Sequence, residues 1–262
     1  MIILNTSSEE FAHSGLVSAR QDERVPRPSV PCLHGLCASE EFAHNGLAPA
    51  RQDERVPRPF VPCLHGGLCA FEGQSWLQHG FGTRHSPAWT GRLATLRQIH
   101  SDVIWSVRQA EGCLGDGDAL ISAEPGVLLA IRTADCVPIL LADPVRRVVA
   151  AVHAGWRGTV AGIAGKTVER MRAEYGTDPT DVLAAIGPSI GPCCFTVGQD
   201  VPLPQQDGKA DLWEANRKQL EGVGVGVIWV AERCTMCEEQ EFYSFRRGKD
   251  TGRMVTAIGI LE

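Results

Sequence analysis

Chemically active side chains gather around two apolar runs in the middle of the chain. Cys136 comes directly before the run 137–142, and His153 directly follows the run 148–152. Both runs have the length and β-branched content of buried strands, and Asp143-Pro144 between them is a turn signal. An antiparallel hairpin about that turn brings a thiol and an imidazole to the same end of a sheet. Such a pair can contribute metal ligands or act as nucleophile and base.

The residues after His153 predict a tight turn into a helix. Gly155 and Gly158 flank Trp156-Arg157, so free backbone N–H groups and a guanidinium could face an anion there. Apolar side chains then recur at spacings of three and four through residues 160–175, and Gly176 stands where a C-terminal cap belongs. We expect this helix to cover the sheet.

The other periodic segments give the fold class. Strand patterns are expected from Trp76 onward, including residues 93–107 with His100 among the strand residues, and again at 181–186, 225–230 and 254–261. A second amphipathic helix is expected over 211–221. The prediction is an α+β (mixed α/β) fold, a mixed β-sheet core with covering helices in a single catalytic domain over residues 71–262.

Composition narrows the class of protein. The 262 residues are 44% hydrophobic and 21% charged, with a net charge of −6, which is an ordinary globular composition without a basic patch for nucleic acid or an anionic membrane. The first residues lack the basic and apolar regions of an export signal, so we expect a cytoplasmic protein. Its ten cysteines are then expected as reduced thiols or metal ligands.

An internal repeat occupies the start of the chain. Residues 8–35 recur almost unchanged at 39–66, an offset of 31 residues. Two near-identical copies indicate a recent tandem duplication and are too few for a solenoid. Rich in Pro and Arg, residues 1–70 are predicted to be a flexible extension that folding and activity do not need. The alternative is a zinc knuckle built from the repeated Cys-Leu-His units, Cys32/His34 and Cys63/His65, with Cys37 and Cys69.

Five motifs in the second part of the chain carry a family resemblance. They are QIHS at 98–101, TADCVPILL at 133–141, AVHAGWRGT at 151–159, GPSIGPCCFTVG at 187–198, and the terminal CT, FYSFRR and TGR over 234–253. Residues 76–262 resemble the family once called multicopper polyphenol oxidases, or laccase-like proteins, and now described as purine nucleoside phosphorylases with adenosine deaminase activity. The repeat lies outside the resemblance.

The resemblance implies one metal site, usually zinc, held by His100, Cys136 and His153. It implies phosphorolysis of adenosine, inosine, guanosine or S-methyl-5'-thioadenosine and hydrolytic deamination of adenosine, with purine nucleosides and inorganic phosphate as substrates. A guanidinium binds phosphate bidentately, so Arg84, Arg157, Arg246 and Arg247 are candidate phosphate ligands. Cys136, Arg157 and Arg84 are the expected catalytic residues.

Other possibilities follow from the same residues. Copper bound in place of zinc would make a polyphenol oxidase, although a trinuclear centre needs more than the four histidines of this region. Cys136 with His153 as base would make a cysteine hydrolase. Only 15 residues separate Arg84 from His100, fewer than is usual in the family, which would suit a metal-binding protein without activity.

Cys234-x₂-Cys237 invites a redox or zinc interpretation, but no second pair lies at zinc-finger spacing. The sequence leaves the oligomeric state open.

Overall fold

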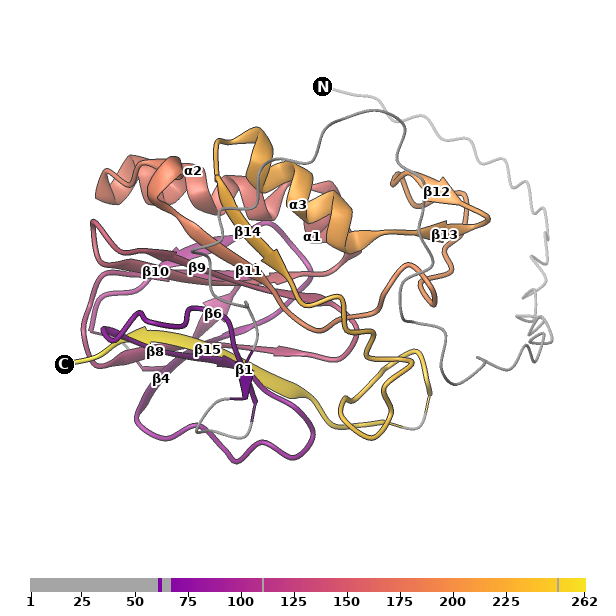
Figure 1. The fold of residues 1–262 in the computed structure, drawn as a ribbon, viewed down its shortest axis with the longest axis horizontal. Helices are drawn as coiled ribbons and strands as arrows, with labels where there is room; N and C mark the ends of the chain where they lie inside the picture. Colours follow the sequence, from indigo (N-terminus) through magenta and orange to yellow (C-terminus); the bar gives the residue numbers. More distant parts are fainter. Residues whose placement is uncertain (1–60, 63–66, 110, 249) are drawn as a thin grey trace, which may run out of the picture. The chain divides into compact units, whose positions relative to one another are not determined.

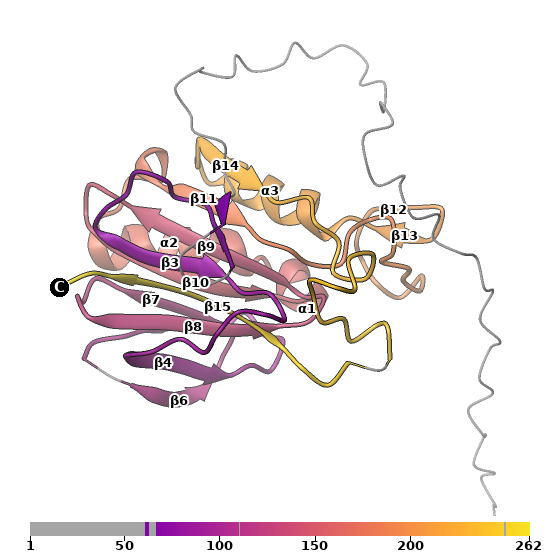
Figure 2. The ribbon, with the colours of Figure 1, turned by 60° about the horizontal axis from the view of Figure 1, so that its bottom comes forward.

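The structure is a computed structural model that describes residues 61–62, 67–109, 111–248 and 250–262. All of them belong to the compact unit Ser39–Glu262. Its strands form a seven-stranded sheet, a six-stranded sheet and a two-stranded hairpin (Figures 1 and 2). In the described part of the chain, no helix is both long and apolar enough to cross a membrane.

The seven-stranded sheet has the order β1-β2-β3-β15-β8-β4-β6. Its inner strands pair antiparallel, β15 with β3 on one side and with β8 on the other, whereas β4 runs parallel to β8 and β6. In sheet order, its strands are β1 (Val61–Pro62), β2 (Leu68–Cys69), β3 (Leu77–Phe81), β15 (Met254–Ile260), β8 (Val127–Thr133), β4 (Arg92–Arg97) and β6 (Gly112–Asp116).

The six-stranded sheet has the order β14-β11-β9-β10-β7-β5. It is centred on the hairpin of β9 and β10, in which Val148 pairs with Asp143 and Ala154 with Val137. The turn is closed by the Asp143 carboxylate, whose Oδ1 accepts the N–H of Val145 at 2.8 Å. Its strands are β14 (Val227–Val230), β11 (Leu183–Ile186), β9 (Val137–Asp143), β10 (Val148–Ala154), β7 (Ala119–Ser122) and β5 (Ile104–Ser106).

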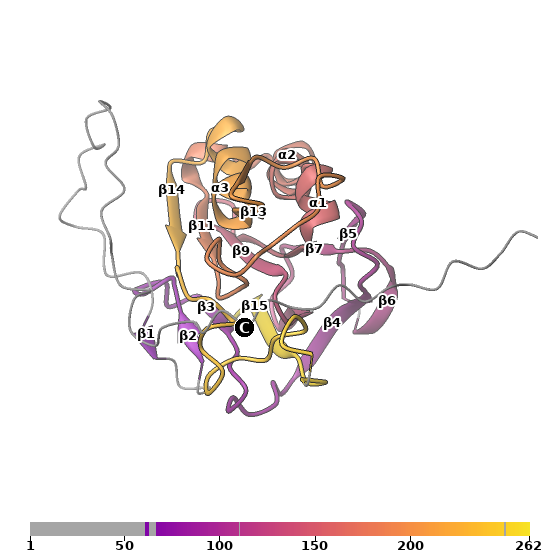
Figure 3. The same ribbon diagram turned by 90° about the vertical axis from the view of Figure 1, so that its right-hand side faces the viewer.

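Helices cover one face of the six-stranded sheet, and the seven-stranded sheet covers the other (Figure 3). The helices are α1 (Trp156–Val160), α2 (Ile163–Tyr175), the 3₁₀ turn η1 (Pro179–Asp181) and α3 (Leu212–Gly222), and a small hairpin of β12 (Gln205–Gln206) and β13 (Lys209–Ala210) precedes α3. Gly176 ends α2 in the left-handed conformation at φ 70°, and the Asp211 carboxylate caps α3 by accepting the N–H of Glu214.

Alternate residues of the central hairpin enter two different cores. Ile139, Leu141 and Val152 pack with Ile163 and Met171 under the helices. Leu140, Val149 and Ala151 pack with Leu129, Ile131 and Ile258 between the sheets. Since a strand presents successive side chains to opposite faces, burial on both faces requires the continuous apolar runs seen in the sequence.

Most predicted elements are confirmed. The fold is α+β, with covering helices and a hairpin about Asp143-Pro144 as expected. The prediction for His100 was wrong, because β4 ends at Arg97, β5 begins at Ile104, and His100 lies in the turn between them at φ 60°.

Ordered strands also begin before Trp76, since Leu68 of β2 pairs with Phe81 of β3. The first repeat copy, with Cys32, His34 and Cys37, and the second copy's Cys63 and His65 lie outside the described residues. The domain boundary at residue 70 therefore stays a prediction.

Candidate metal centre and active site

Three potential metal ligands meet at one end of the central hairpin. The Nδ1 or Nε2 atoms of His100 and His153 and the Sγ of Cys136 all lie within 4.8 Å of one another. The two imidazole rings stand edge to face, with centroids 5.0 Å apart at 72°. We call this set the His-Cys-His cluster. Two nitrogens and one sulfur are the donor types that zinc takes in proteins, and three protein ligands leave one position open.

The hairpin register brings two of the three ligands together. His153 is the next-to-last residue of β10 and pairs with Pro138, two residues beyond Cys136 on the neighbouring strand. The N–H of His153 donates to the carbonyl oxygen of Asp118 at 2.7 Å, which ties β10 to the start of β7. Strand pairing therefore fixes Cys136 and His153 close together. The two apolar runs and the turn between them already predict this pairing from the sequence.

Asp118 holds the third ligand in place. Its carboxylate, on a fully buried residue, accepts the N–H of Ile99, His100 and Ser101 at 3.3, 3.0 and 2.6 Å, and the hydroxyl of Ser101 at 2.7 Å. The left-handed conformation of His100 costs of order 1–3 kcal/mol, which these bonds offset. The same carboxylate lies 2.8 Å from Nδ1 of His153. A carboxylate on Nδ1 selects the tautomer that leaves Nε2 available to a metal.

The electrostatics of the cluster favour a thiolate. Burial by itself raises the pKa of Cys136, but hydrogen bonds and charge from His100 and His153 outweigh it and lower that pKa to about 6. Burial likewise disfavours charge on His153, yet Asp118 and Cys136 raise the pKa of His153 to about 9. Against the same burial cost, His153 and Ser101 lower the pKa of Asp118 to about 2. Cys136 is then already in the form that binds metals at neutral pH, while His153 must release its proton to coordinate one.

Gly155 lets the backbone approach the His-Cys-His cluster closely. A Cβ at this position would lie 2.9 Å from Cδ2 of His100 and 3.2 Å from Sγ of Cys136. Gly155 is also the N-cap of α1. Only a residue without a side chain fits between the helix start and the two ligands.

The His-Cys-His cluster belongs to the lining of a pocket of about 730 Å³. Guanidinium groups dominate the polar part of that lining, and aromatic rings contribute to the apolar part. The arginines are Arg97, Arg132, Arg157, Arg246 and Arg253, and the aromatic residues are Trp156, Phe195 and Phe245. Asp135 is the one acidic residue of the lining. The chemistry of the pocket therefore suits a ligand with an anionic group and a flat apolar part.

Comparison with known proteins identifies the family of this chain. The multi-copper polyphenol oxidoreductase laccase family matches residues 83–261. The chain belongs to this family.

Individual relatives of this chain are named purine nucleoside phosphorylases rather than laccases. A purine nucleoside phosphorylase from Deinococcus radiodurans is 45% identical over 182 residues, which are 64% of this chain and 70% of the relative. One from Bacteroides thetaiotaomicron is 44% identical over 59% of this chain and 65% of the relative. The crystal structure of YlmD from Geobacillus stearothermophilus superposes with a TM-score of 0.70 at 32% identity and covers 79% of this chain and 100% of that one.

The four arginines expected to bind phosphate separate into two groups. Arg157 and Arg246 line the pocket, each stacked on a neighbouring ring: Arg157 on Trp156 at 4.4 Å and Arg246 on Phe195 at 5.0 Å. Stacking occupies the face of a guanidinium and leaves its N–H edge for hydrogen bonds. On Arg246, Nη1 of that edge already donates to the Thr196 carbonyl at 2.8 Å.

Arg84 and Arg247 lie outside the pocket lining. Arg84 Nη2 donates to the carbonyl of Phe242 at 2.9 Å and to Asp250 at 3.4 Å. Arg247 Nη1 donates to Asp250 at 2.7 Å, and its Nη2 donates to the carbonyl of Thr235. These donors hold the segment before β15 together, so nothing in the pocket geometry supports the expected catalytic role of Arg84.

Several residues of the site were missed from the sequence. Asp118 ends the glycine-aspartate run 115–118, directly before β7, and an acid at a strand start was the available signal. Arg97 and Arg132 directly precede the QIHS and TADC motifs, and Arg253 lies just before β15. Their position beside laccase-family motifs was visible, but only the fold brings them to one pocket.

Proposed function

We propose that this protein is a purine nucleoside phosphorylase that holds one zinc ion with His100, Cys136 and His153. The observation that carries the proposal is the meeting of this His-Cys-His cluster with arginine side chains in one pocket. The purine nucleoside phosphorylase relatives point the same way. Zinc, when bound, supplies a Lewis acid beside the substrate.

The pocket residues have distinct roles in this proposal. In phosphorolysis, the bond from the ribose carbon to the purine nitrogen breaks, a bond to a phosphate oxygen forms, and the departing base takes the proton that the phosphate gives up. Arg157 and Arg246 hold the phosphate, because a guanidinium matches its geometry bidentately. Phe195, Phe245 and Trp156 offer flat apolar surface for the base. Asp118 orients His153 and so keeps the ligand geometry during turnover.

Adenosine deamination is the second activity that we propose. It is favoured by the three-ligand set, which leaves one coordination position for water or substrate.

A polyphenol oxidase is less well supported. Among the described residues, the other two histidines serve elsewhere: His79 accepts backbone N–H groups, and His85 bonds the Gln240 carbonyl at 2.6 Å. The described residues thus offer no histidine set for a trinuclear copper centre.

Product analysis tests the proposal. Purified protein of known metal content is incubated with adenosine or inosine, with and without inorganic phosphate, and the products are separated by chromatography. Phosphorolysis gives free base and ribose 1-phosphate only when phosphate is present, and deamination gives inosine from adenosine in either case. A cysteine hydrolase would act without metal, and an oxidase would consume dioxygen with phenols. Absence of nucleoside turnover in metal-loaded protein would contradict the proposal.

A further inference from the structure

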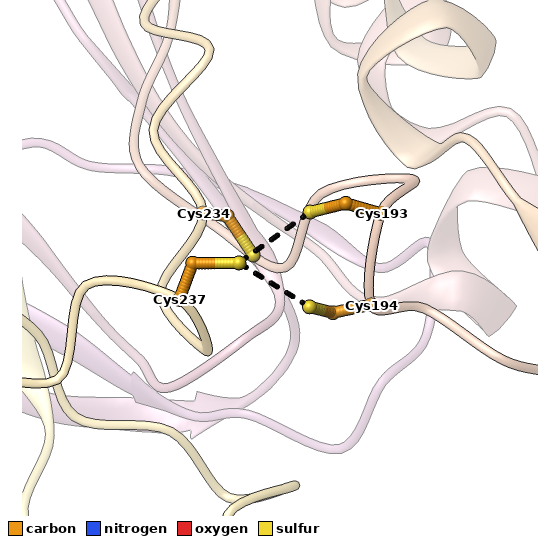
Figure 4. Close-up of side chains that lie close together, drawn as sticks. All are labelled: Cys193, Cys194, Cys234 and Cys237. Atoms are coloured by element: carbon orange, nitrogen blue, oxygen red, sulfur yellow. Dashed lines mark hydrogen bonds between the residues drawn. The ribbon is translucent and has the colours of Figure 1, made fainter. Parts of the chain in front are cut away.

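Four cysteines from two distant segments meet at a second place in the fold (Figure 4). Cys193 and Cys194 are neighbours in the loop after β11, and Cys234 and Cys237 lie in the segment between β14 and β15. We call this set the four-cysteine cluster. The sequence has no second pair at zinc-finger spacing. The second pair is contiguous, and only the fold brings it to the first.

The geometry points to one metal ion, and we propose that the four-cysteine cluster binds a zinc ion as a tetrathiolate. All four Sγ atoms lie within 4.8 Å of one another. The Sγ of Cys237 is 3.7 Å from that of Cys193 and 3.4 Å from that of Cys194. Tetrahedral zinc with bonds of about 2.3 Å separates its sulfurs by roughly 3.8 Å. A disulfide would need about 2.05 Å, and a multi-iron cluster would need more space between the thiols.

Backbone hydrogen bonds hold the two cysteine segments against each other. Ser189 and Cys234 form a parallel β-bridge, in which Ser189 N–H donates to the Arg233 carbonyl at 3.2 Å and Thr235 N–H donates to the Ser189 carbonyl at 3.0 Å. The indole of Trp213 in α3 donates to the Ser189 hydroxyl at 2.6 Å. These hydrogen bonds position the backbone that carries the four thiols.

The surroundings suit thiolate ligands. The N–H of Gly191 lies 3.3 Å from Sγ of Cys234, the most buried thiol of the set, and such N–H donors stabilise metal-bound sulfur. A Cβ on Gly191 would lie 3.3 Å from Sγ of Cys193 and 2.7 Å from the Trp213 ring. Lys209 places its ammonium group at the Cys193 carbonyl, 2.9 Å away, which offsets part of the negative charge of a zinc tetrathiolate.

The zinc ion in the four-cysteine cluster has a structural role. The four thiolates fill all of its coordination positions and leave none for a substrate. The segments that it joins also carry pocket residues, Ile190 and Phe195 on one and Phe245 and Arg246 on the other. Asp135, beside the ligand Cys136, binds both segments: its carbonyl accepts the N–H of Ile190 at 2.9 Å and its carboxylate accepts the N–H of Arg246 at 2.7 Å. The zinc thereby fixes one wall of the pocket.

Metal counting on the full chain tests this site independently of the proposed function. The background is a Cys136→Ala/His153→Ala variant, which removes two ligands of the His-Cys-His cluster. Adding Cys234→Ser and Cys237→Ser should lower bound zinc by one equivalent, and should abolish the sulfur-to-cobalt charge-transfer bands of the cobalt-substituted protein. Cys113→Ser, at an exposed thiol outside both clusters, is the matched control and should change neither. Unchanged metal content and spectrum on loss of Cys234 and Cys237 would overturn the site.

A second measurement needs no variant that might misfold. Wild-type protein is treated with an alkylating reagent, and modified cysteines are mapped by mass spectrometry before and after metal is removed with a chelator in denaturant. Cys193 and Cys113 are both exposed, so with zinc bound Cys113 should react at once while Cys193, Cys194, Cys234 and Cys237 are protected together. Immediate reaction of Cys193, or a mass showing disulfides among these four residues in untreated protein, would refute the tetrathiolate.

Discussion

The carboxylate of Asp118 lies 2.8 Å from Nδ1 of His153 and also accepts the backbone N–H of His100, so one buried side chain positions two of the three residues in the His-Cys-His cluster. A carboxylate that bonds the ring nitrogen facing away from the metal fixes both the tautomer and the direction of a ligating imidazole. Asp118 is accordingly a positioning residue, and its contribution can be separated from that of the ligands themselves.

Replacing Asp118 should weaken metal binding while all three ligands remain. In Asp118→Asn, an amide NH₂ faces backbone N–H donors, and His153 loses the charge that raises its pKa. We expect metal affinity to fall about 10- to 100-fold, measured by competition with a chromogenic chelator. Asp116→Asn is the matched control, because Asp116 lies two residues away and bonds the exposed Arg97. Equal metal affinity in Asp118→Asn and wild type would contradict the assigned role.

A methyl group at Gly155 should disturb the same cluster from the other side. The Cβ of Gly155→Ala would lie within 3.2 Å of both His100 and Cys136, and a contact this short forces the ligands apart. We expect metal affinity to drop roughly 10-fold or more. Gly222→Ala is the control, since a Cβ there meets no atom within 4 Å. Metal binding that survives Gly155→Ala unchanged would show that the ligands relax freely.

Protonation of His79 should destabilise the fold in mild acid. Its Nε2 accepts the N–H of Ala70 and Phe71 at 3.2 and 2.9 Å, so the imidazole must be neutral. Burial lowers the pKa of His79 from 6.5 to about 4. Between these values the unfolded chain binds the proton and the folded chain does not, so stability is fully present above pH 6.5 and decreases as the pH falls toward 4.

Between pH 6.5 and 4, titration of His79 should lower the free energy of unfolding by roughly 3 kcal/mol. Urea unfolding at several pH values measures this change. His79→Gln keeps a hydrogen-bond acceptor but cannot titrate. It should therefore flatten the profile between pH 6.5 and 4. An identical slope in His79→Gln and wild type would assign the acid sensitivity to another group.

Truncation should distinguish the repeat from the first ordered strands. Removing residues 1–60 is expected to leave the melting temperature close to that of the full chain, as the polar, Pro-rich sequence predicts. Extending the deletion through Phe71 should destabilise the protein by about 3–5 kcal/mol, because Ala70 and Phe71 are buried and β2 pairs with β3. Thermal unfolding of the two truncated forms decides this. A large loss on removing residues 1–60 alone would refute the extension.

Arg157 and Arg84 should respond differently to truncation to alanine. Arg157 lines the pocket, so Arg157→Ala should raise KM for phosphate about tenfold or more without lowering the melting temperature. Arg84 bonds Phe242 and Asp250, so Arg84→Ala should lower stability by about 1–3 kcal/mol. Steady-state kinetics at varied phosphate, paired with thermal unfolding, compare the two. A raised phosphate KM with unchanged stability in Arg84→Ala would restore Arg84 as a phosphate ligand.

The sequence by itself determined the hairpin, the helix after it and the approach of Cys136 to His153. These features depend on short-range signals: two apolar runs, a turn of Asp143-Pro144, and a glycine on each side of Trp156-Arg157. In a hairpin, the short turn sets the register of the two strands. Cys136 and His153, 17 positions apart, could therefore be brought together without knowledge of the rest of the fold.

Only the tertiary structure decided the conformation of His100, the role of Asp118 and the four-cysteine cluster. His100 adopts its left-handed turn because a carboxylate 18 residues later accepts its N–H group. Cys194 meets Cys237 across 43 residues because β11 pairs with β9 and with β14. Hydrogen bonds and packing between segments distant in the chain leave no periodic or spacing signal in a single sequence, since each partner satisfies its local propensity equally well without the other.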